Sequence, residues 1–189
     1  MTFEKFRQAI TSSVFTTTSV SVAFPLESPH SINISLYRFA RSKKIVSIKR
    51  GLYKFLDSKI DEFALAGILY TPSYVSMESV LNSCGVIPDI PLSVTSVTTT
   101  TSKKIVTSMG NYFYSKIPLE LYFGFEKMAD PISGVYYNIA NPEKALLDYL
   151  YVRRIKNLAN YRIDLTHLNR IKLTEFIKHY PLWLQRILP

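Results

Sequence analysis

The chain has 189 residues, of which 47% are hydrophobic and 13% aromatic, and it carries a formal net charge of +9. These values are typical of a folded protein with one domain or two small ones, and they exclude a disordered chain. The single cysteine, Cys84, excludes an internal disulfide and a cysteine-based zinc site. No apolar run approaches the roughly 20 residues that cross a bilayer, and residues 1–23 lack the apolar segment of a signal peptide. We therefore expect a cytoplasmic protein that does not bind membranes.

The positive charge is concentrated in the first third of the chain. Residues 1–60 contain ten Lys or Arg and three Asp or Glu, a net charge of 10 − 3 = +7, whereas residues 61–189 contain thirteen and eleven, a net charge of 13 − 11 = +2. A local excess of this kind is typical of a module that binds a polyanion. The alternative is a solvated basic face without a ligand.

Two helices are predicted at the start of the basic third. The first follows Thr2 as its cap, because apolar residues recur at spacings of three and four: Phe3, Phe6, Ile10 and Val14. The second is short, from about Ser19 to Phe24. It ends before Pro25, because proline disfavours helix in the residue that precedes it. Residues 26–30 are expected to form a turn.

The third predicted helix is the candidate recognition helix. Ser31 is its expected cap, and it runs to about Arg41 with an apolar stripe: Ile32, Leu36 and Phe39 (or Ala40). The opposite face carries the residues that are expected to contact DNA: Asn33, Tyr37, Arg38 and Arg41. Arginine reads guanine edges and asparagine reads adenine, and all of these side chains can hold phosphates. The alternative is an ordinary solvated helix face.

A β-hairpin with a basic tip is predicted over residues 45–55. Gly51 supplies the positive φ that a tight turn needs. Five cations of the helix end and the hairpin can neutralise phosphates: Lys43, Lys44, Lys49, Arg50 and Lys54. Arg50 could also enter a minor groove, or the tip could be an ordinary charged turn. Three helices followed by such a hairpin are typical of a winged helix-turn-helix, which we predict for residues 1–57.

Residues 58–189 are predicted to form a second domain of mixed α and β structure. Residues 63–70 form a short buried element, and a helix capped by Ser73 or Ser76 reaches Cys84, where Gly85 ends it. On that helix Cys84 is expected to be a small core residue. Strands are expected where β-branched and aromatic residues dominate, with a turn at Met109-Gly110-Asn111: residues 93–101, 105–107, 112–114 and 135–139.

A further helix is predicted to start at Asn141-Pro142-Glu143, where asparagine caps, proline occupies the first turn and an acid follows. Lys144 and Asp148 are then expected to form an exposed pair one helical turn apart, and Glu143 to be a first-turn charge. Short helices follow over residues 164–188, broken at Pro181. The fold class is therefore α+β: an N-terminal winged helix-turn-helix followed by a mixed C-terminal domain.

Several motifs of the second domain occur together in a characteristic order. They are YVSMESVLNSCGVIP (residues 74–88), VTSVTT (94–99), MGNYFY (109–114), YFGF (122–125) and ANPEKALLDYLY (140–151), and IKRGLY (48–53) precedes them. As a set they resemble the AbiEi family of antitoxins and transcriptional regulators of type IV toxin–antitoxin systems, which act in abortive infection, a form of phage defence. The resemblance implies a winged helix-turn-helix that binds inverted repeats in its own promoter as an autorepressor, and a C-terminal domain needed for antitoxicity. It also implies a nucleotidyltransferase-like toxin as the functional partner, countered without a stable complex.

Two smaller basic clusters lie in the second domain: Lys103 with Lys104, and Arg153 and Arg154 with Lys156. They either extend a DNA track, meet an acidic partner or are solvated surface. The many tyrosines are expected at half-buried strand positions, with a stacking surface for nucleic acid as the alternative: Tyr112, Tyr114, Tyr122, Tyr136 and Tyr137.

Enzyme motifs are absent from the sequence. It has no phosphate-binding glycine-rich loop and no nucleophile elbow, and its three histidines lack metal-ligand spacing. We therefore predict a DNA-binding regulator without catalytic residues, metal or cofactor. The alternatives are a module that binds a toxin or another protein directly through the second domain, and, least favoured, an enzyme that acts on nucleic acid.

Overall fold

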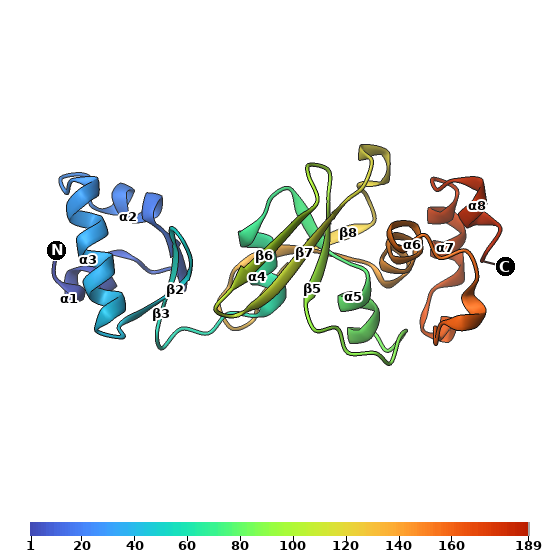
Figure 1. Cartoon of the computed structure of the whole chain (residues 1–189), viewed down its shortest axis with the longest axis horizontal. Coiled ribbons are helices and arrows are strands. Elements are labelled where there is room, and N and C mark those ends of the chain that lie inside the picture. The colour runs from blue at the N-terminus through green and yellow to red at the C-terminus, as the bar shows by residue number, and fades with distance from the viewer. Residues whose placement is uncertain (189) are drawn as a thin grey trace. The chain divides into compact units, whose positions relative to one another are not determined.

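The computed structural model describes residues 1–188 and has a mixed α+β fold with eight α-helices and two β-sheets in that range, which confirms the predicted class. The chain divides into two compact units (Figure 1). The first comprises Met1–Asp61 with the short segments Val106–Met109 and Pro131–Gly134, and the second comprises the rest of the described chain. Within residues 1–188, no helix has the length and apolar character that a membrane span requires.

The first unit combines three helices with a three-stranded sheet. Its elements are α1 (Phe3–Ala9), β1 (Val14–Thr16), α2 (Thr17–Ala23), α3 (Pro29–Arg41), β2 (Ile45–Lys49) and β3 (Leu52–Phe55). Strand β3 lies between β1 and β2 and is antiparallel to both. The first helix starts after Thr2 and the hairpin covers residues 45–55, as the sequence predicted.

Phenylalanines form the core of this unit. Phe6 of α1 is fully buried, and its ring centroid lies 5.2 Å from that of Phe15, 5.3 Å from that of Phe39 and 5.6 Å from that of Phe55. These rings come from α1, β1, α3 and β3, so one aromatic cluster joins the helices to the sheet. This packing fixes which face of α3 is turned inward.

The predicted bounds of the first two helices are corrected by a strand that the sequence analysis missed. Helix α1 ends at Ala9, and Val14 belongs to β1, where it pairs with Lys54 of β3. The spacing from Ile10 to Val14 fits a helix, but the same residue completes the sheet. Thr16 then caps α2 through its side chain, so α2 begins at Thr17, two residues before the predicted start at Ser19.

The start of α3 is also corrected. Ser28 is its N-cap, because the Ser28 hydroxyl accepts a hydrogen bond from the Ser31 amide, and Pro29 occupies the first turn. Proline fits there because its fixed φ is helical and its missing N–H would have no partner. Ser31, the predicted cap, lies inside the helix and donates its hydroxyl to Glu27 at 2.6 Å.

The second unit is built on a six-stranded mixed sheet in the order β6-β7-β5-β4-β9-β8. Strands β5 and β7 are parallel, as are β4 and β9, whereas β4 is antiparallel to β5 and β8 to β9. The strands are β4 (Ser73–Val75), β5 (Val94–Thr98), β6 (Lys103–Thr107), β7 (Gly110–Lys116), β8 (Phe125–Ala129) and β9 (Tyr136–Ala140).

The helices of the second unit lie against this sheet and against one another. Helix α4 packs on β9 and β4, and α6 packs between α5 and α7 (Figure 1). The α-helices are α4 (Glu62–Leu69), α5 (Glu78–Ser83), α6 (Pro142–Arg153), α7 (Arg170–Ile177) and α8 (Leu182–Gln185). Short 3-10 helices cover Leu119–Leu121, Leu158–Asn160 and Leu165–His167.

Most of the predicted elements of the second unit are confirmed, with two corrections. Helix α6 begins after Asn141, and Gly85, at φ +73°, follows the end of α5 as predicted. The cap of α5 was predicted wrongly: Ser73 lies in β4, Ser76 follows that strand, and the helix starts only at Glu78. Strand β8 was not predicted at all.

Candidate nucleic-acid interface

Helix α3 presents a polar face that contains every residue predicted for its contact with DNA. Asn33, Tyr37, Arg38 and Arg41 are all exposed, and Tyr37 keeps 67% of its surface. The opposite face is buried through Ile32, Leu36 and Phe39, as predicted. Because the aromatic core holds the buried face, the polar face projects from the unit on a rigid element.

No acidic residue lies between Ser28 and Leu56, whereas this segment contains seven Lys or Arg. The nearest carboxylates in the chain are also engaged: Glu27 pairs with the N-terminal ammonium at 3.2 Å, and Asp57 pairs with Arg7 at 3.2 Å. The cations of α3 and the hairpin therefore have no carboxylate within their own segment. Such a surface attracts a polyanion.

The end of α3 holds Lys43 in a left-handed conformation, at φ 56°. The Lys43 amide donates to the Ala40 carbonyl, and the Lys44 amide donates to the Phe39 carbonyl. These two bonds form the C-terminal turn known as the Schellman motif. The Lys44 ammonium lies 4.8 Å from the centroid of the Phe3 ring, while the Lys43 side chain is exposed.

The hairpin carries Arg50 at its tip beside Gly51, whose φ of +79° matches the predicted turn. Arg50 is exposed and Lys49 is half-buried. Lys54 is placed differently from the other cations, because its ammonium donates to the Ser58 carbonyl at 2.6 Å and to the Phe55 carbonyl at 3.3 Å. Lys54 would have to give up these two bonds to reach a phosphate.

The basic residues of the second unit differ in their partners. Arg153 donates to Glu78 at 2.7 Å, so its charge is compensated. The ammonium groups of Lys103 and Lys104 lie over aromatic rings, those of Tyr70 and Phe113 respectively. Arg154 and Lys156 are exposed. Arg153 therefore belongs to a structural ion pair, whereas the remaining four residues are surface cations: Lys103, Lys104, Arg154 and Lys156.

The pair formed by Lys144 and Asp148 is buried, not exposed as predicted. Both side chains have 0% exposure, and the Lys144 ammonium donates to Asp148 and, at 2.6 Å, to the Tyr180 hydroxyl. Removal from water lowers the pKa of the Lys144 ammonium, although the Asp148 carboxylate acts in the opposite direction. The expectation failed because this face of α6 is covered by Tyr74 of β4, by Phe123 and by Tyr180, which precedes α8.

Three hydroxyl groups complete the environment of the Asp148 carboxylate. Tyr74 donates to it at 2.9 Å, Ser76 at 2.8 Å and Tyr180 at 2.8 Å. Burial, followed by the nearby Asp148 charge, raises the pKa of both tyrosines. Every group in this cluster has a partner, as a buried polar network requires. We assign it a structural role, because it ties β4, α6 and the segment before α8 together.

Glu143 is buried as well, and its carboxylate accepts a hydrogen bond from the Asn169 amide at 2.7 Å. It therefore fixes the start of α7 in addition to its place in the first turn of α6. Gly124 stands beside the cluster, where an added Cβ would lie 3.0 Å from Cγ of Lys144. Glycine is required at position 124 for two reasons: a side chain would collide with Lys144, and the backbone has a φ of +71°.

Two further expectations about single residue types are corrected. Cys84 is exposed rather than a core residue, because α5 ends at Ser83 and Cys84 lies in the cap that leads to Gly85. Among the tyrosines, Tyr112, Tyr114 and Tyr137 are buried strand residues, more deeply than expected, whereas Tyr136 is 63% exposed. Tyr122 is half-buried and lies outside the strands.

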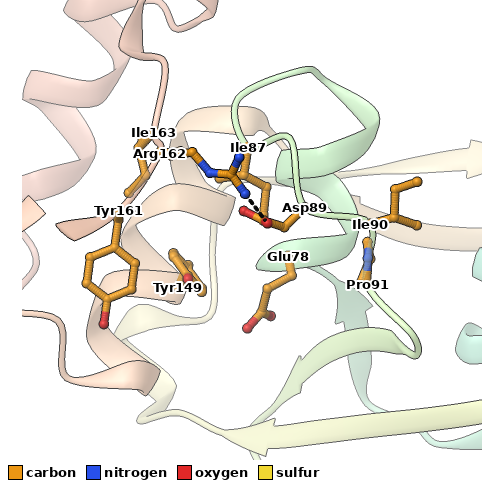
Figure 2. A pocket seen from close by; sticks show the side chains of 9 residues that line it. All are labelled: Glu78, Ile87, Asp89, Ile90, Pro91, Tyr149, Tyr161, Arg162 and Ile163. Carbon is orange, nitrogen blue, oxygen red and sulfur yellow. Dashed lines mark hydrogen bonds and ion pairs between the residues drawn. The ribbon is translucent and has the colours of Figure 1, made fainter.

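A pocket of about 190 Å³ lies in the second unit and is lined by two carboxylates and two tyrosines (Figure 2). Asp89 pairs with Arg162 at 2.7 Å, and one oxygen of Glu78 pairs with Arg153. The other oxygen of Glu78, Oε2, is buried without a hydrogen-bond partner in the described part of the chain. Since an arginine balances each carboxylate, the pocket has no excess charge that would select a cation.

Residues 1–188 contain no group of three or more His, Cys, Asp or Glu side chains that could hold a metal ion. In sequence comparisons the chain matches no family model and no curated protein.

Proposed function

We propose that the first unit is a winged helix-turn-helix that binds double-stranded DNA, with α3 as the recognition helix and the β2–β3 hairpin as the wing. The order α1-β1-α2-α3-β2-β3, with β3 between β1 and β2, supports this reading. In such modules the recognition helix enters the major groove and presents side chains to base edges.

The observation that carries the proposal is the polar face of α3. It holds Asn33, Arg38 and Arg41, all exposed, within a segment that has seven cations and no acid. Arg38 is the candidate for a bidentate contact with guanine, and Asn33 for a contact with adenine. Lys43, Lys44, Lys49 and Arg50 would neutralise phosphates, which adds affinity but little sequence information.

We further propose that the protein is an antitoxin of a type IV toxin–antitoxin system that represses its own promoter and counters a nucleotidyltransferase-like toxin. The motifs shared with the AbiEi family support this step. The second unit would then carry antitoxicity. Co-expression with a nucleotidyltransferase-like toxin tests this: the Arg38→Gln variant is expected to lose repression while it still restores growth, because Arg38 lies in the first unit.

The DNA-binding proposal is tested with duplex DNA from upstream of the protein's own coding region, against a scrambled duplex. The wild-type protein is expected to prefer the upstream duplex. Replacement of Arg38 by Gln should cost about 1–3 kcal/mol of binding free energy on the upstream duplex and little on the scrambled one. Arg170→Gln is the matched control, because Arg170 is also exposed and lies in the second unit.

Equal, weak binding of both duplexes would overturn the proposal of sequence-specific recognition. The remaining hypothesis would then be a module that binds a toxin or another protein directly through the second unit. Co-purification of the tagged chain with the neighbouring gene product in near-equal amounts would support that hypothesis.

A further inference from the structure

A second pocket in the second unit has the charge and the shape to take an anionic ligand with a flat ring. Its volume is about 440 Å³, within the range of small-molecule sites. Four separate segments line it: the loop before β6, the end of β7, the end of α6 and the start of α8. It therefore exists only in the folded unit, although its residues are spread over 82 positions, from Ser102 to Trp183.

The lining is cationic and contains no carboxylate. Lys116 and Arg154 both line the pocket and both are exposed, and no Asp or Glu occurs among its lining residues in the described chain. No ion-pair partner for either cation is found within residues 1–188. The acid-lined pocket of Figure 2 differs in this respect, because its charges are already balanced.

A hydroxyl group lies beside the two cations. The Ser102 hydroxyl oxygen accepts a hydrogen bond from the Lys116 amide at 2.9 Å, so its own hydrogen remains available to an anion. Ser115 also lines the pocket. Two cations and nearby hydroxyl groups can together donate hydrogen bonds to the oxygens of a phosphate.

Aromatic rings form another wall of the same pocket. The rings of Tyr151 and Trp183 both line it, and they lie nearly parallel at 19° with centroids 6.4 Å apart. Both side chains are half-buried, so part of each ring remains accessible. Aromatic rings of this kind stack on nucleobases regardless of base identity.

We propose that this pocket binds a nucleoside phosphate, with the phosphate between Lys116 and Arg154 and the base stacked against Trp183. The site is independent of DNA binding by α3, which belongs to the other unit. The proposal also gives Lys116 and Arg154, two exposed cations of the second unit, a common ligand. The nucleoside phosphate is either a free nucleotide or the end of a single strand, which present the same chemistry.

Trp183 is the only tryptophan of the chain, so its fluorescence reports on this pocket alone. The full-length protein is titrated with ATP and GTP, with inorganic triphosphate as charge without a base, and with adenosine as base without charge. We expect saturable quenching by both nucleotides and affinities at least about tenfold weaker for triphosphate and adenosine, because each lacks one half of the contacts.

The Lys116→Gln and Arg154→Gln variants are each expected to weaken nucleotide binding about tenfold, by loss of one charged hydrogen bond. Lys156→Gln is the matched control: it removes the same charge two residues from Arg154 but does not line the pocket. Because all three residues are exposed, the variants should fold, and thermal unfolding of each verifies this. Calorimetry with Trp183→Leu should show a similar loss, which tests stacking.

A short single-stranded RNA with a 5′-phosphate distinguishes the two sources of ligand. Tighter binding of the RNA than of ATP would assign the pocket to strand ends, and equal or weaker binding would assign it to free nucleotides. The proposal is overturned if nucleotides cause no saturable change in Trp183 emission, or if Lys156→Gln weakens binding as much as Arg154→Gln does.

Discussion

Asp148 is the residue on which the polar interior of the second unit depends. Four donors point at its carboxylate: the hydroxyl groups of Tyr74, Ser76 and Tyr180, and the Lys144 ammonium. A buried ion pair stabilises little compared with well-packed apolar residues, but the loss of one member leaves the other charge buried and unpaired. The cost of a substitution here therefore depends on which partner remains.

Replacement of Asp148 alone by Leu is expected to reduce the free energy of unfolding by about 3–5 kcal/mol, because the Lys144 charge loses its counter-ion. The double variant Asp148→Leu with Lys144→Met should lose less, since no buried charge remains. Urea denaturation of the wild type and of both variants measures the difference. A double variant as unstable as the single one would show that the hydrogen bonds of the cluster, not the charge balance, set the cost.

The raised pKa values of the two tyrosines of the cluster predict how the free energy of unfolding changes at alkaline pH. Burial and the Asp148 charge raise the pKa of Tyr74 and Tyr180 above the unfolded value of about 10. The unfolded chain then loses protons that the folded chain keeps, so the free energy of unfolding should fall as the pH rises above about 10.

The Tyr180→Phe variant should show a shallower decline over this alkaline range, because one of the two groups no longer ionises in the unfolded state. Urea denaturation at a series of pH values measures the slope. Tyr161→Phe is the control, since Tyr161 is exposed and its removal should leave the contribution of the cluster intact. An identical slope for Tyr180→Phe and the wild type would contradict the assignment.

At the scale of single elements, the start of α3 decides how firmly the candidate recognition helix is held. The Ser28 hydroxyl accepts from the Ser31 amide at 3.2 Å, so Ser28→Ala is expected to cost about 1 kcal/mol of stability. Ser31→Ala leaves this cap in place and removes only the bond to Glu27, so it should cost less. Denaturant unfolding of the two variants compares them. A larger cost for Ser31→Ala would restore Ser31 as the critical residue at the helix start.

The elements that could be predicted from the sequence are those with long periodic patterns or strong end signals. Helix α3 has a regular apolar stripe, and α6 begins with Asn141 and Pro142. Strand β1 has only three residues, and its first residue, Val14, also continues the helical spacing of α1. Strand β8 lacks alternation because four of its five residues are exposed. Both are recognisable only from the strands beside them.

The buried pair of α6 shows why part of the site could not be predicted. Lys144 and Asp148 are four residues apart, a spacing that is the same for an exposed pair and a buried one. The available signal is the apolar surroundings: Tyr151 and Val152 lie one turn beyond Asp148 on the same face, and the helix also contains Ala145, Leu146, Leu147 and Leu150. By contrast, the exposure of Asn33, Tyr37, Arg38 and Arg41 follows directly from the stripe on the opposite side of α3.

At the scale of the whole molecule, charge and burial are distributed differently in the two units. The first unit has a small phenylalanine core and a segment, residues 28–56, with seven Lys or Arg and no acid. The second unit buries an ion pair and balances Glu78 and Asp89 with arginines. A basic surface that merely kept the protein in solution would not need to be confined to one unit. The salt dependence of DNA binding can separate a local interface from a general effect of net charge.

Two lysine doublets make this separation possible. Lys43 and Lys44 follow the C-terminal cap of α3, and Lys103 and Lys104 begin β6 in the second unit; all four are exposed. If the first doublet contacts phosphates, replacing it by two glutamines should reduce the slope of log affinity against log salt by about 1.8, or about 0.9 per contact. Replacing the second doublet removes the same net charge and should leave the slope unchanged.

Fluorescence anisotropy of labelled duplex DNA over a salt series measures both slopes. Equal reductions from the two doublets would mean that the DNA track continues onto the second unit, as one reading of its basic clusters holds. No reduction from either doublet would mean that the contacts come from Arg41, Lys49 and Arg50 instead. A reduction from the first doublet alone would confine the interface to α3 and the hairpin, since the two variants have the same total charge and differ only in where it was removed.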